Sequence, residues 1–275
     1  MRAGRARGRL WIMRTEAATL PGSAERPNED WLAAALPASG AGGVVVVLDG
    51  VTPPAGPDGC VHGVPWFTAR LGGALTELSV SRPDLTLPEI LSLAIRRTAD
   101  AHRDSCDLSH VRTPQATVAL ARWDGTVVEH LVLSDAALLL RAPDGSVRAV
   151  LDDRLGRVPV EILRSLEATD RLRNREGGFF TAAADPSVAA LAVTGTTPRT
   201  AVRAVAALTD GATRWVDVFG QGTWADLFDV LDAEGPRGLL RRVRALESAD
   251  AAPAPGGAVR RRKRHDDATA VYAVL

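Results

Sequence analysis

Cysteine and long apolar runs are scarce in this sequence. The 275 residues include two cysteines, too few for a disulfide scaffold, which favours a reduced, cytoplasmic protein. No apolar run approaches the roughly 18 residues of a membrane span, so no membrane partner is expected. The stretch Leu10-Trp11-Ile12-Met13 is too short for the core of a signal peptide. We interpret residues 1–13 as a basic N-terminal arm, either disordered or the product of an early start codon, with Met13 as the alternative start.

Net charge is also missing. The 33 Lys and Arg residues balance 33 Asp and Glu residues, so the chain lacks the overall positive field that nucleic-acid binding exploits, and no nucleic-acid partner is expected. Lysine is nearly absent, since Lys263 is the only one, and the excess of arginine reflects a GC-rich genome. The basic residues 260–264 form one local patch, which is either a solvated loop or a contact for an anionic partner such as a phosphoprotein.

The amino-acid composition excludes a disordered chain. Its residues are 46% hydrophobic and 24% charged, a composition typical of a packed core. Two segments rich in turn residues, 52–59 and 248–265, are too short to separate domains. We therefore expect one domain over residues 14–275.

Apolar patterning predicts both strands and helices. Short aliphatic runs bounded by turn residues predict buried strands, whereas apolar residues at three- and four-residue spacing predict helices. The sequence Thr86-Leu-Pro-Glu89 forms a capping box before one helix, and Asp144-Gly145 predicts a hairpin. Paired helices between runs of antiparallel strands favour an α+β fold over a Rossmann-type alternation. The expected strands are residues 44–48, 117–121, 127–133, 137–140, 205–208 and 269–275, and the expected helices cover residues 67–78, 87–98, 224–231 and 239–246.

Acidic residues stand where apolar segments end. Carboxylates at strand ends are held on rigid elements, and several that converge repel one another unless cations neutralise them. Mg²⁺ and Mn²⁺ prefer such oxygen ligands, and glycine beside a ligand lets its main-chain carbonyl approach the ion. The pattern therefore predicts an all-oxygen divalent metal centre. Its candidate residues are Glu29, Asp30, Asp49, Gly50, Asp135, Asp210 and Asp266.

The order of these motifs resembles that of the bacterial type of metal-dependent protein phosphatases, the PP2C (PPM) family, over nearly the whole chain. The resemblance implies a four-layer α-β-β-α sandwich of two antiparallel sheets flanked by helices. The motifs, in chain order, are Asn28-Glu29-Asp30, Asp49-Gly50 after an apolar strand, Thr117-Val-Ala-Leu120, Ser134-Asp135-Ala-Ala-Leu-Leu-Leu-Arg141, Leu208-Thr-Asp-Gly-Ala-Thr213 and Asp266-Asp-Ala-Thr-Ala-Val-Tyr272.

The resemblance also implies a mechanism. Asp49 would bridge two metal ions, the Gly50 carbonyl would bind the second ion, and Asp210 and Asp266 would complete the first. The two ions would share a water, lower its pKa and direct it at phosphorus without a covalent phosphoenzyme. The implied activity is Mg²⁺- or Mn²⁺-dependent hydrolysis of phosphoserine and phosphothreonine on a phosphorylated protein substrate.

Further roles follow from the same resemblance. Glu29 and Asp30 would bind or orient waters at the second ion, and Asp135 together with Asp210 would hold a third ion found in bacterial relatives. Arg26 corresponds to an arginine that grips the phosphate through its fork of donors. It stands one position closer to the acidic motif than is usual, which weakens its assignment as the clamp.

The chain departs from the family pattern at several positions. Val51-Thr52-Pro53 stands where eukaryotic members have His-Gly-Gly, so their general-acid histidine has no counterpart, as in bacterial relatives. Ser134 replaces a usual glycine and Asp267 replaces a usual asparagine. The proline-rich residues 52–65 are an insertion that affects substrate access. These departures leave two alternatives open: a catalytically weak phosphatase-like binding or regulatory module, and a phosphatase of small phosphate esters.

A second group of residues suits a different metal. Cys60 and His62 are two residues apart, and His102 and Cys106 are one helical turn apart. Two cysteines and two histidines bind tetrahedral zinc if the helix end folds back on the loop. A buried cysteine pair or unrelated neighbours are the alternatives, because the spacings match no standard zinc motif.

Overall fold

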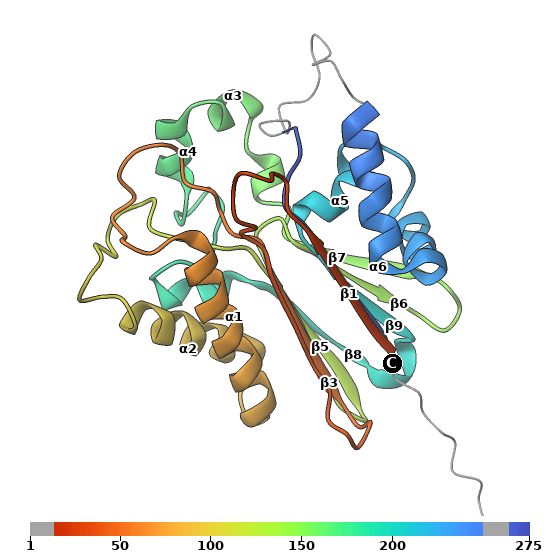
Figure 1. Ribbon diagram of the computed structural model, residues 1–275. Helices are drawn as coiled ribbons and strands as arrows, with labels where there is room; N and C mark the ends of the chain where they lie inside the picture. The colour runs from red at the N-terminus through yellow and green to blue at the C-terminus, as the bar shows by residue number, and fades with distance from the viewer. Residues whose placement is uncertain (1–13, 250–263) are drawn as a thin grey trace, which may run out of the picture.

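The computed structural model describes residues 14–249 and 264–275. The expected arm at residues 1–13, Lys263 and most of the basic run 260–264 lie outside the described residues. Within them, two antiparallel sheets of five strands pack face to face, in the orders β2-β3-β4-β5-β8 and β1-β10-β9-β6-β7 (Figure 1). The strands are β1 (Arg14–Leu20), β2 (Trp31–Ala35), β3 (Gly43–Leu48), β4 (Val118–Trp123), β5 (Val127–Leu133), β6 (Ala137–Arg141), β7 (Val147–Leu151), β8 (Val193–Pro198), β9 (Ala204–Leu208) and β10 (Ala268–Val274).

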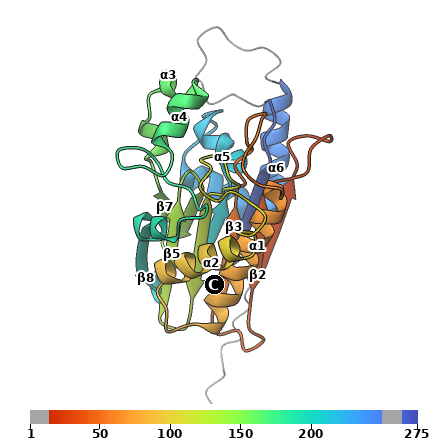
Figure 2. The same cartoon turned by 90° about the vertical axis from the view of Figure 1, so that its left-hand side faces the viewer.

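Helices cover the outer faces of both sheets. Helices α1 and α2 pack outside the first sheet and α5 and α6 outside the second, so the predicted four-layer α-β-β-α sandwich is confirmed (Figures 1 and 2). Helices α3 and α4 lie at one end of the sandwich, at the top of Figure 2. The bounds are α1 (Val64–Ser81), α2 (Leu87–Asp100), α3 (Val160–Leu163), α4 (Leu166–Leu172), α5 (Asp210–Asp217) and α6 (Trp224–Ala249).

Three apolar layers hold the sandwich together. Because successive strand residues face opposite sides, Val45 and Val47 of β3 contact the second sheet, whereas Val44 and Val46 pack under α1 and α2. A third cluster, which includes Phe228, joins the second sheet to α5 and α6. Strands buried on both faces have continuous aliphatic sequences, which is why the runs at β3, β4, β6 and β9 were predictable.

Helix boundaries follow their local sequence. Thr86 and Glu89 form the predicted capping box at the start of α2. The two helices expected at 224–231 and 239–246 occur as one segment, α6, broken at Gly235, whose φ is +68° immediately before Pro236. The structure thus confirms the predicted pair of helices. No helix in the described ranges has the length and apolarity needed to cross a bilayer.

Strand register brings the acidic motifs to one end of the sandwich. Trp31 at the start of β2 pairs with Leu48 at the end of β3. In the other sheet Leu208, at the end of β9, pairs with Ala137 and Ala270 near the starts of β6 and β10. The loops that carry the candidate carboxylates therefore leave or enter the sheets at the same end.

Candidate metal centre

Asp49 and Gly50 continue β3 beyond its last regular residue. The Thr117 N–H donates to the Asp49 carbonyl at 2.9 Å, and Thr117 Oγ1 accepts from the Asp49 N–H at 3.3 Å. Gly50 extends this pairing through a bridge to Ala116. A Cβ at position 50 would lie 2.6 Å from the Glu29 carbonyl oxygen. Glycine is therefore required for the close approach of the two acidic segments.

Asp210 is the first residue of helix α5, directly after β9. The preceding residue, Thr209, donates its N–H to the Thr269 carbonyl at 3.0 Å, and its Oγ1 accepts from the Thr269 N–H at 2.9 Å. A Cβ on Gly211 would lie 1.9 Å from the Asp267 carbonyl oxygen. Only glycine lets α5 begin against β10, and this contact fixes the position of Asp210.

Asp30 and Glu29 reach the same place from the start of β2. Thr209 Oγ1 donates to Asp30 Oδ2 at 3.0 Å, which joins the two sheets across the site. Asp30 Oδ1 is buried and has no hydrogen-bond partner among the described residues. Thr52 Oγ1 donates to Glu29 Oε2. Both acidic side chains are thus positioned by threonine hydroxyls.

Asp135 follows a strained turn after β5. Ser134 has a φ of +67°, which lies in the left-handed region that favours glycine. The Ser134 N–H donates to Asp152 Oδ2 at 2.9 Å. Asp152 is buried and pairs with Arg154 at 2.6 Å. This anchored carboxylate holds the turn that presents Asp135.

The two neighbouring aspartates before β10 have different surroundings. Asp267 accepts the N–H of Gly22 at Oδ1 (2.7 Å) and the N–H of Glu29 at Oδ2 (2.8 Å). Both of its oxygens are therefore used to hold the loop before β2. Asp266 Oδ1 accepts the Asp267 N–H at 3.1 Å. Of the pair, Asp266 is the better candidate ligand.

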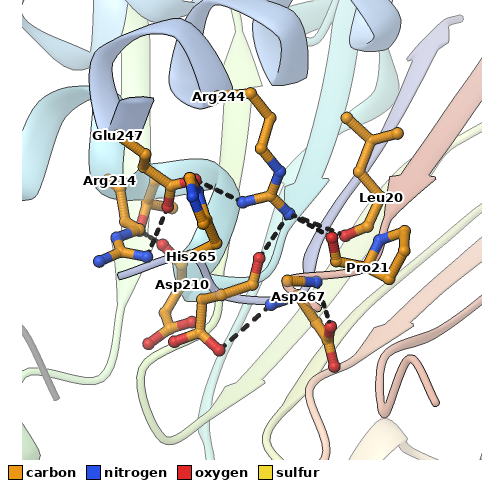
Figure 3. Close-up of polar contacts among 11 residues, drawn as sticks. Leu20, Pro21, Asp210, Arg214, Arg244, Glu247, His265 and Asp267 are labelled. Atoms are coloured by element: carbon orange, nitrogen blue, oxygen red, sulfur yellow. Dashed lines mark hydrogen bonds and ion pairs between the residues drawn. The ribbon is translucent and has the colours of Figure 1, made fainter. Parts of the chain in front are cut away.

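A buried ionic network supports this segment (Figure 3). The Glu247 side chain is fully buried and accepts from Arg214 Nη1 at Oε1 and from Arg244 Nη1 at Oε2, both at 2.5 Å. His265 Nδ1 lies 2.9 Å from Glu247 Oε2. A buried carboxylate needs such partners because an unpaired buried charge is strongly destabilising.

Arg244 connects the network to the site. Its Nη2 donates to the carbonyls of Leu20 (3.0 Å) and Pro21 (3.1 Å), which Figure 3 labels, and to the carbonyl of Asp266 (2.5 Å). Leu20 is the last residue of β1, Pro21 follows it, and Asp266 lies two residues before β10. The guanidinium of α6 thus fixes the main chain at Asp266.

The carboxylates interact strongly with one another. Burial, and then repulsion by Asp135 and Asp266, raises the pKa of Asp210 to about 8. Burial, followed by repulsion from Asp210 and Asp30, raises the pKa of Asp49 well above its ordinary value. Burial also raises the pKa of Asp30 to about 7. The five carboxylates of Asp30, Asp49, Asp135, Asp210 and Asp266 therefore influence one another's ionisation.

This donor set fits divalent cations. The protein partners at the site are hydroxyls and main-chain groups, while Asp30 Oδ1 is buried without a partner. Hard cations take carboxylate and carbonyl oxygens as ligands, and their charge would remove the repulsion that raises the pKa values of Asp49 and Asp210. The residues present therefore suit Mg²⁺ or Mn²⁺.

A pocket of about 190 Å³ lies next to the segment that follows Gly50. Thr52, which binds Glu29, contributes to its lining together with Val51, residues of helix α4 and residues of the segment between α2 and β4. The insertion identified in the sequence thus forms part of a pocket wall. Arg26 lies exposed in the loop before Asp30, which leaves its guanidinium accessible to an anionic ligand.

Several residues that shape the site were not identified from the sequence. Thr209, Asp152, Arg244 and Glu247 carry no motif of their own, and their partners lie far along the chain. The threonine between β9 and Asp210 was visible only as part of the Leu-Thr-Asp-Gly sequence. No signal in the sequence marks the others.

The two cysteines and their histidines also come together. The ligand atoms of Cys60, His62, His102 and Cys106 all lie within 4.8 Å of one another. The helix end does fold back on the loop, because α1 and α2 form a hairpin whose ends meet there. This cluster is separate in its residues and in its chemistry from the carboxylates.

Comparison with known proteins places the chain among phosphatases. The family model described as "Protein phosphatase 2C" matches residues 23–245. No curated protein matches the chain in sequence. The similarity to solved structures, in contrast, extends over nearly the whole chain.

Three solved structures illustrate that similarity. The serine/threonine phosphatase Stp1 from Staphylococcus aureus is 12% identical, with 99% of each chain covered and a TM-score of 0.58. The serine/threonine phosphatase PstP/Ppp from Mycobacterium tuberculosis is 17% identical, with 96% of this chain and 99% of that one covered and a TM-score of 0.58. A PstP catalytic domain solved with 2 manganese ions is 17% identical, with 95% and 97% covered and a TM-score of 0.56.

Proposed function

Because the chain belongs to the protein phosphatase 2C family, we propose that it is a phosphatase that uses Mg²⁺ or Mn²⁺ to hydrolyse phosphoserine and phosphothreonine on proteins. The observation that carries the proposal is the convergence of Asp30, Asp49, Asp135, Asp210 and Asp266 in one mutually repelling cluster. A cytoplasmic setting, with bacterial phosphoproteins as partners, is part of the same proposal.

The carboxylates would hold two ions, and three if Asp135 takes part. Asp49, the Gly50 carbonyl, Asp210 and Asp266 would be the principal ligands, with Glu29 and Asp30 at the second ion. When bound, the ions supply Lewis-acid activation of an attacking water and neutralise charge on the phosphoryl oxygens. The manganese-bound PstP domain supports this choice of metal.

The remaining work falls to the protein's own groups. Thr209 and Thr52 orient Asp30 and Glu29 through their hydroxyls. The exposed guanidinium of Arg26 can donate a fork of hydrogen bonds to the phosphate. The pocket beside Thr52 can receive the peptide on one side of the phosphoresidue. Such preorganisation of charges and orientation supplies most of the rate enhancement in phosphoryl transfer.

Phosphate release tests the proposal. We expect Mn²⁺-dependent release from phosphothreonine and phosphoserine peptides, abolished by chelation, and a fall of at least about 100-fold in kcat/KM for Asp49→Asn, since even changes around metal ligands cost about 10–100-fold. Asp153→Asn is the matched control, because Asp153 is exposed and pairs only with Arg157 in the described structure.

Three outcomes would overturn it. Phosphopeptide binding without metal-dependent release would identify a phosphatase-like binding module. Faster hydrolysis of small esters such as p-nitrophenyl phosphate or a sugar phosphate, with peptides untouched, would assign the enzyme to small substrates. Equal activity of the Asp49→Asn variant would remove the carboxylate cluster from the chemistry.

A further inference from the structure

Four side chains outside the carboxylate cluster form a compact group of soft metal ligands. Cys60 and His62 lie in the segment between β3 and α1, and His102 and Cys106 lie just beyond the end of α2. Their ligand atoms are all within 4.8 Å of one another. The group brings together residues that are far apart in the sequence. Cys60 and Cys106, for example, are 46 positions apart, yet their Sγ atoms lie 2.9 Å from each other.

The distances match a tetrahedral zinc site. Zinc bonds of about 2.3 Å to sulfur and about 2.0–2.1 Å to nitrogen place sulfur and nitrogen ligands about 3.5 Å apart. The observed separations from sulfur to Nδ1 are 3.7 Å (Cys60 to His62), 3.5 Å (Cys60 to His102) and 3.3 Å (Cys106 to His62). The histidines therefore already have the spacing that the ion requires.

The two sulfurs are neither bonded to each other nor far apart. Their separation of 2.9 Å exceeds a disulfide bond of about 2.05 Å, and both cysteines are free thiols. Tetrahedral zinc places two sulfurs about 3.8 Å apart. Side-chain rotations that move each sulfur by less than about 1 Å would bring the two sulfurs to that separation.

Main-chain N–H groups and an aromatic ring hold the four side chains in place. The main-chain N–H groups of His62 and Val61 donate to Cys60 Sγ and Cys106 Sγ, both at 3.4 Å. Trp66 stacks on the His62 ring at 4.0 Å and contacts the His102 ring at 5.2 Å. Outer contacts of this kind orient metal ligands and control the access of solvent.

We propose that Cys60, His62, His102 and Cys106 bind one structural zinc ion. Four protein ligands leave no open position, which is the property of structural rather than catalytic zinc sites. Two thiolates and two neutral imidazoles balance the charge of Zn²⁺. Thiolate and imidazole ligands prefer zinc, whereas the carboxylates of the other site suit Mg²⁺ or Mn²⁺.

The ion fastens two walls of the substrate pocket. Val51–Pro54 and the residues Arg112, Thr113 and Gln115 line that pocket, and the first segment leads into Cys60 while the second follows Cys106. Between them, the Asp107 N–H donates to the Gly59 carbonyl at 2.7 Å. Zinc therefore holds the insertion after Asp49-Gly50 against the loop that follows α2.

Metal analysis of untagged protein, purified without added metal, tests the site. We expect one zinc per chain in the wild type and in Asp49→Asn, and loss of that zinc in the double variant Cys60→Ser, Cys106→Ser. Retention in Asp49→Asn distinguishes this site from the carboxylates and keeps the result independent of phosphatase activity. The proposal would be overturned if the wild type contained no zinc. It would also be overturned if Asp49→Asn lost the zinc while the double cysteine variant kept it.

A second measurement on the wild type does not depend on how the variants fold. Cobalt exchanged for zinc should show the intense ligand-field bands of a tetrahedral ion and a thiolate-to-cobalt charge-transfer band in the near ultraviolet. The cysteines should react with a thiol reagent only after chelation. Octahedral cobalt, freely reactive thiols in the folded protein, or an intact mass short of two hydrogens from a Cys60–Cys106 disulfide would contradict the site.

Discussion

At the residue scale, the acidic side chains that suit the protein for metal binding work against its stability without metal. The side chains of Asp49 and Asp210 are both buried in this cluster and affect each other's pKa. Burial and repulsion by neighbouring carboxylates raise the pKa values of both groups and so disfavour their ionised forms. Divalent ions bound at these carboxylates would relieve both effects, and the proposed metal binding would then be coupled to folding.

The sign of this coupling gives a pH prediction for the metal-free protein. The pKa of Asp210 rises from 3.8 to about 8 on folding, so the folded state holds a proton that the unfolded state releases. The contribution of Asp210 to the free energy of unfolding is therefore fully present below pH 3.8 and is lost as the pH rises through about 8. Asp210→Asn stays neutral. In the presence of chelator, the thermal midpoint of the wild type should therefore fall relative to that of the variant as the pH rises from about 4 to about 8.

Manganese provides the control for that measurement. It should raise the thermal midpoint of the wild type at high pH, because the ion takes the place of the proton, and it should do so much less for Asp210→Asn. A difference between the two proteins that is independent of pH would show that Asp210 is not part of a buried, repelling cluster.

At the scale of elements, the sequence predicted those strands and helices whose patterns are strong. The aliphatic runs of β3 and β9 and the capping box of α2 are confirmed. The hairpin predicted at Asp144-Gly145 is confirmed, since it joins β6 to β7. Strands β1, β2 and β8 were missed, since they are short or partly exposed and carry mixed side chains such as those of Val193–Pro198. Their pairing partners, rather than their own propensity, make them strands.

Two adjacent glycines of α1 test how this helix packs on the sheet. A Cβ on Gly72 would lie 2.1 Å from the Trp31 ring of β2, whereas a Cβ on the exposed Gly73 meets nothing within 4 Å. Gly72→Ala should therefore destabilise by about 1–3 kcal/mol through overpacking. Gly73→Ala should stabilise by up to about 1 kcal/mol, because alanine favours the helix.

Denaturant unfolding of the two variants measures these effects side by side. The same chemical change, one residue apart, removes composition and propensity as explanations. If Gly72→Ala were as stable as Gly73→Ala, the close packing of α1 against Trp31 would be wrong.

At the scale of the whole molecule, the balanced charge count hides an uneven distribution. The sequence drew attention to Asp49, Asp135 and Asp210 because each follows a recognisable apolar strand, whereas Asp30 precedes a strand that the sequence did not predict. It could not identify Thr209, Arg244 or Glu247, since their roles depend on contacts between β10, α6 and the end of β1 that only the folded chain creates. The cysteine and histidine pairs were visible, but their meeting depends on the α1–α2 hairpin.

The central claim is that one carboxylate cluster does metal-dependent chemistry, and the neighbours Asp266 and Asp267 test it most directly. Asp266 faces the repelling carboxylates, whereas both oxygens of Asp267 bind main-chain N–H groups of the preceding loop. The measurement is phosphate release from a phosphothreonine peptide across a Mn²⁺ titration. We predict that Asp266→Asn loses at least about 100-fold in activity or needs far more Mn²⁺, and that Asp267→Asn remains active. Equal activity of the two variants, or loss in Asp267→Asn alone, would contradict the account.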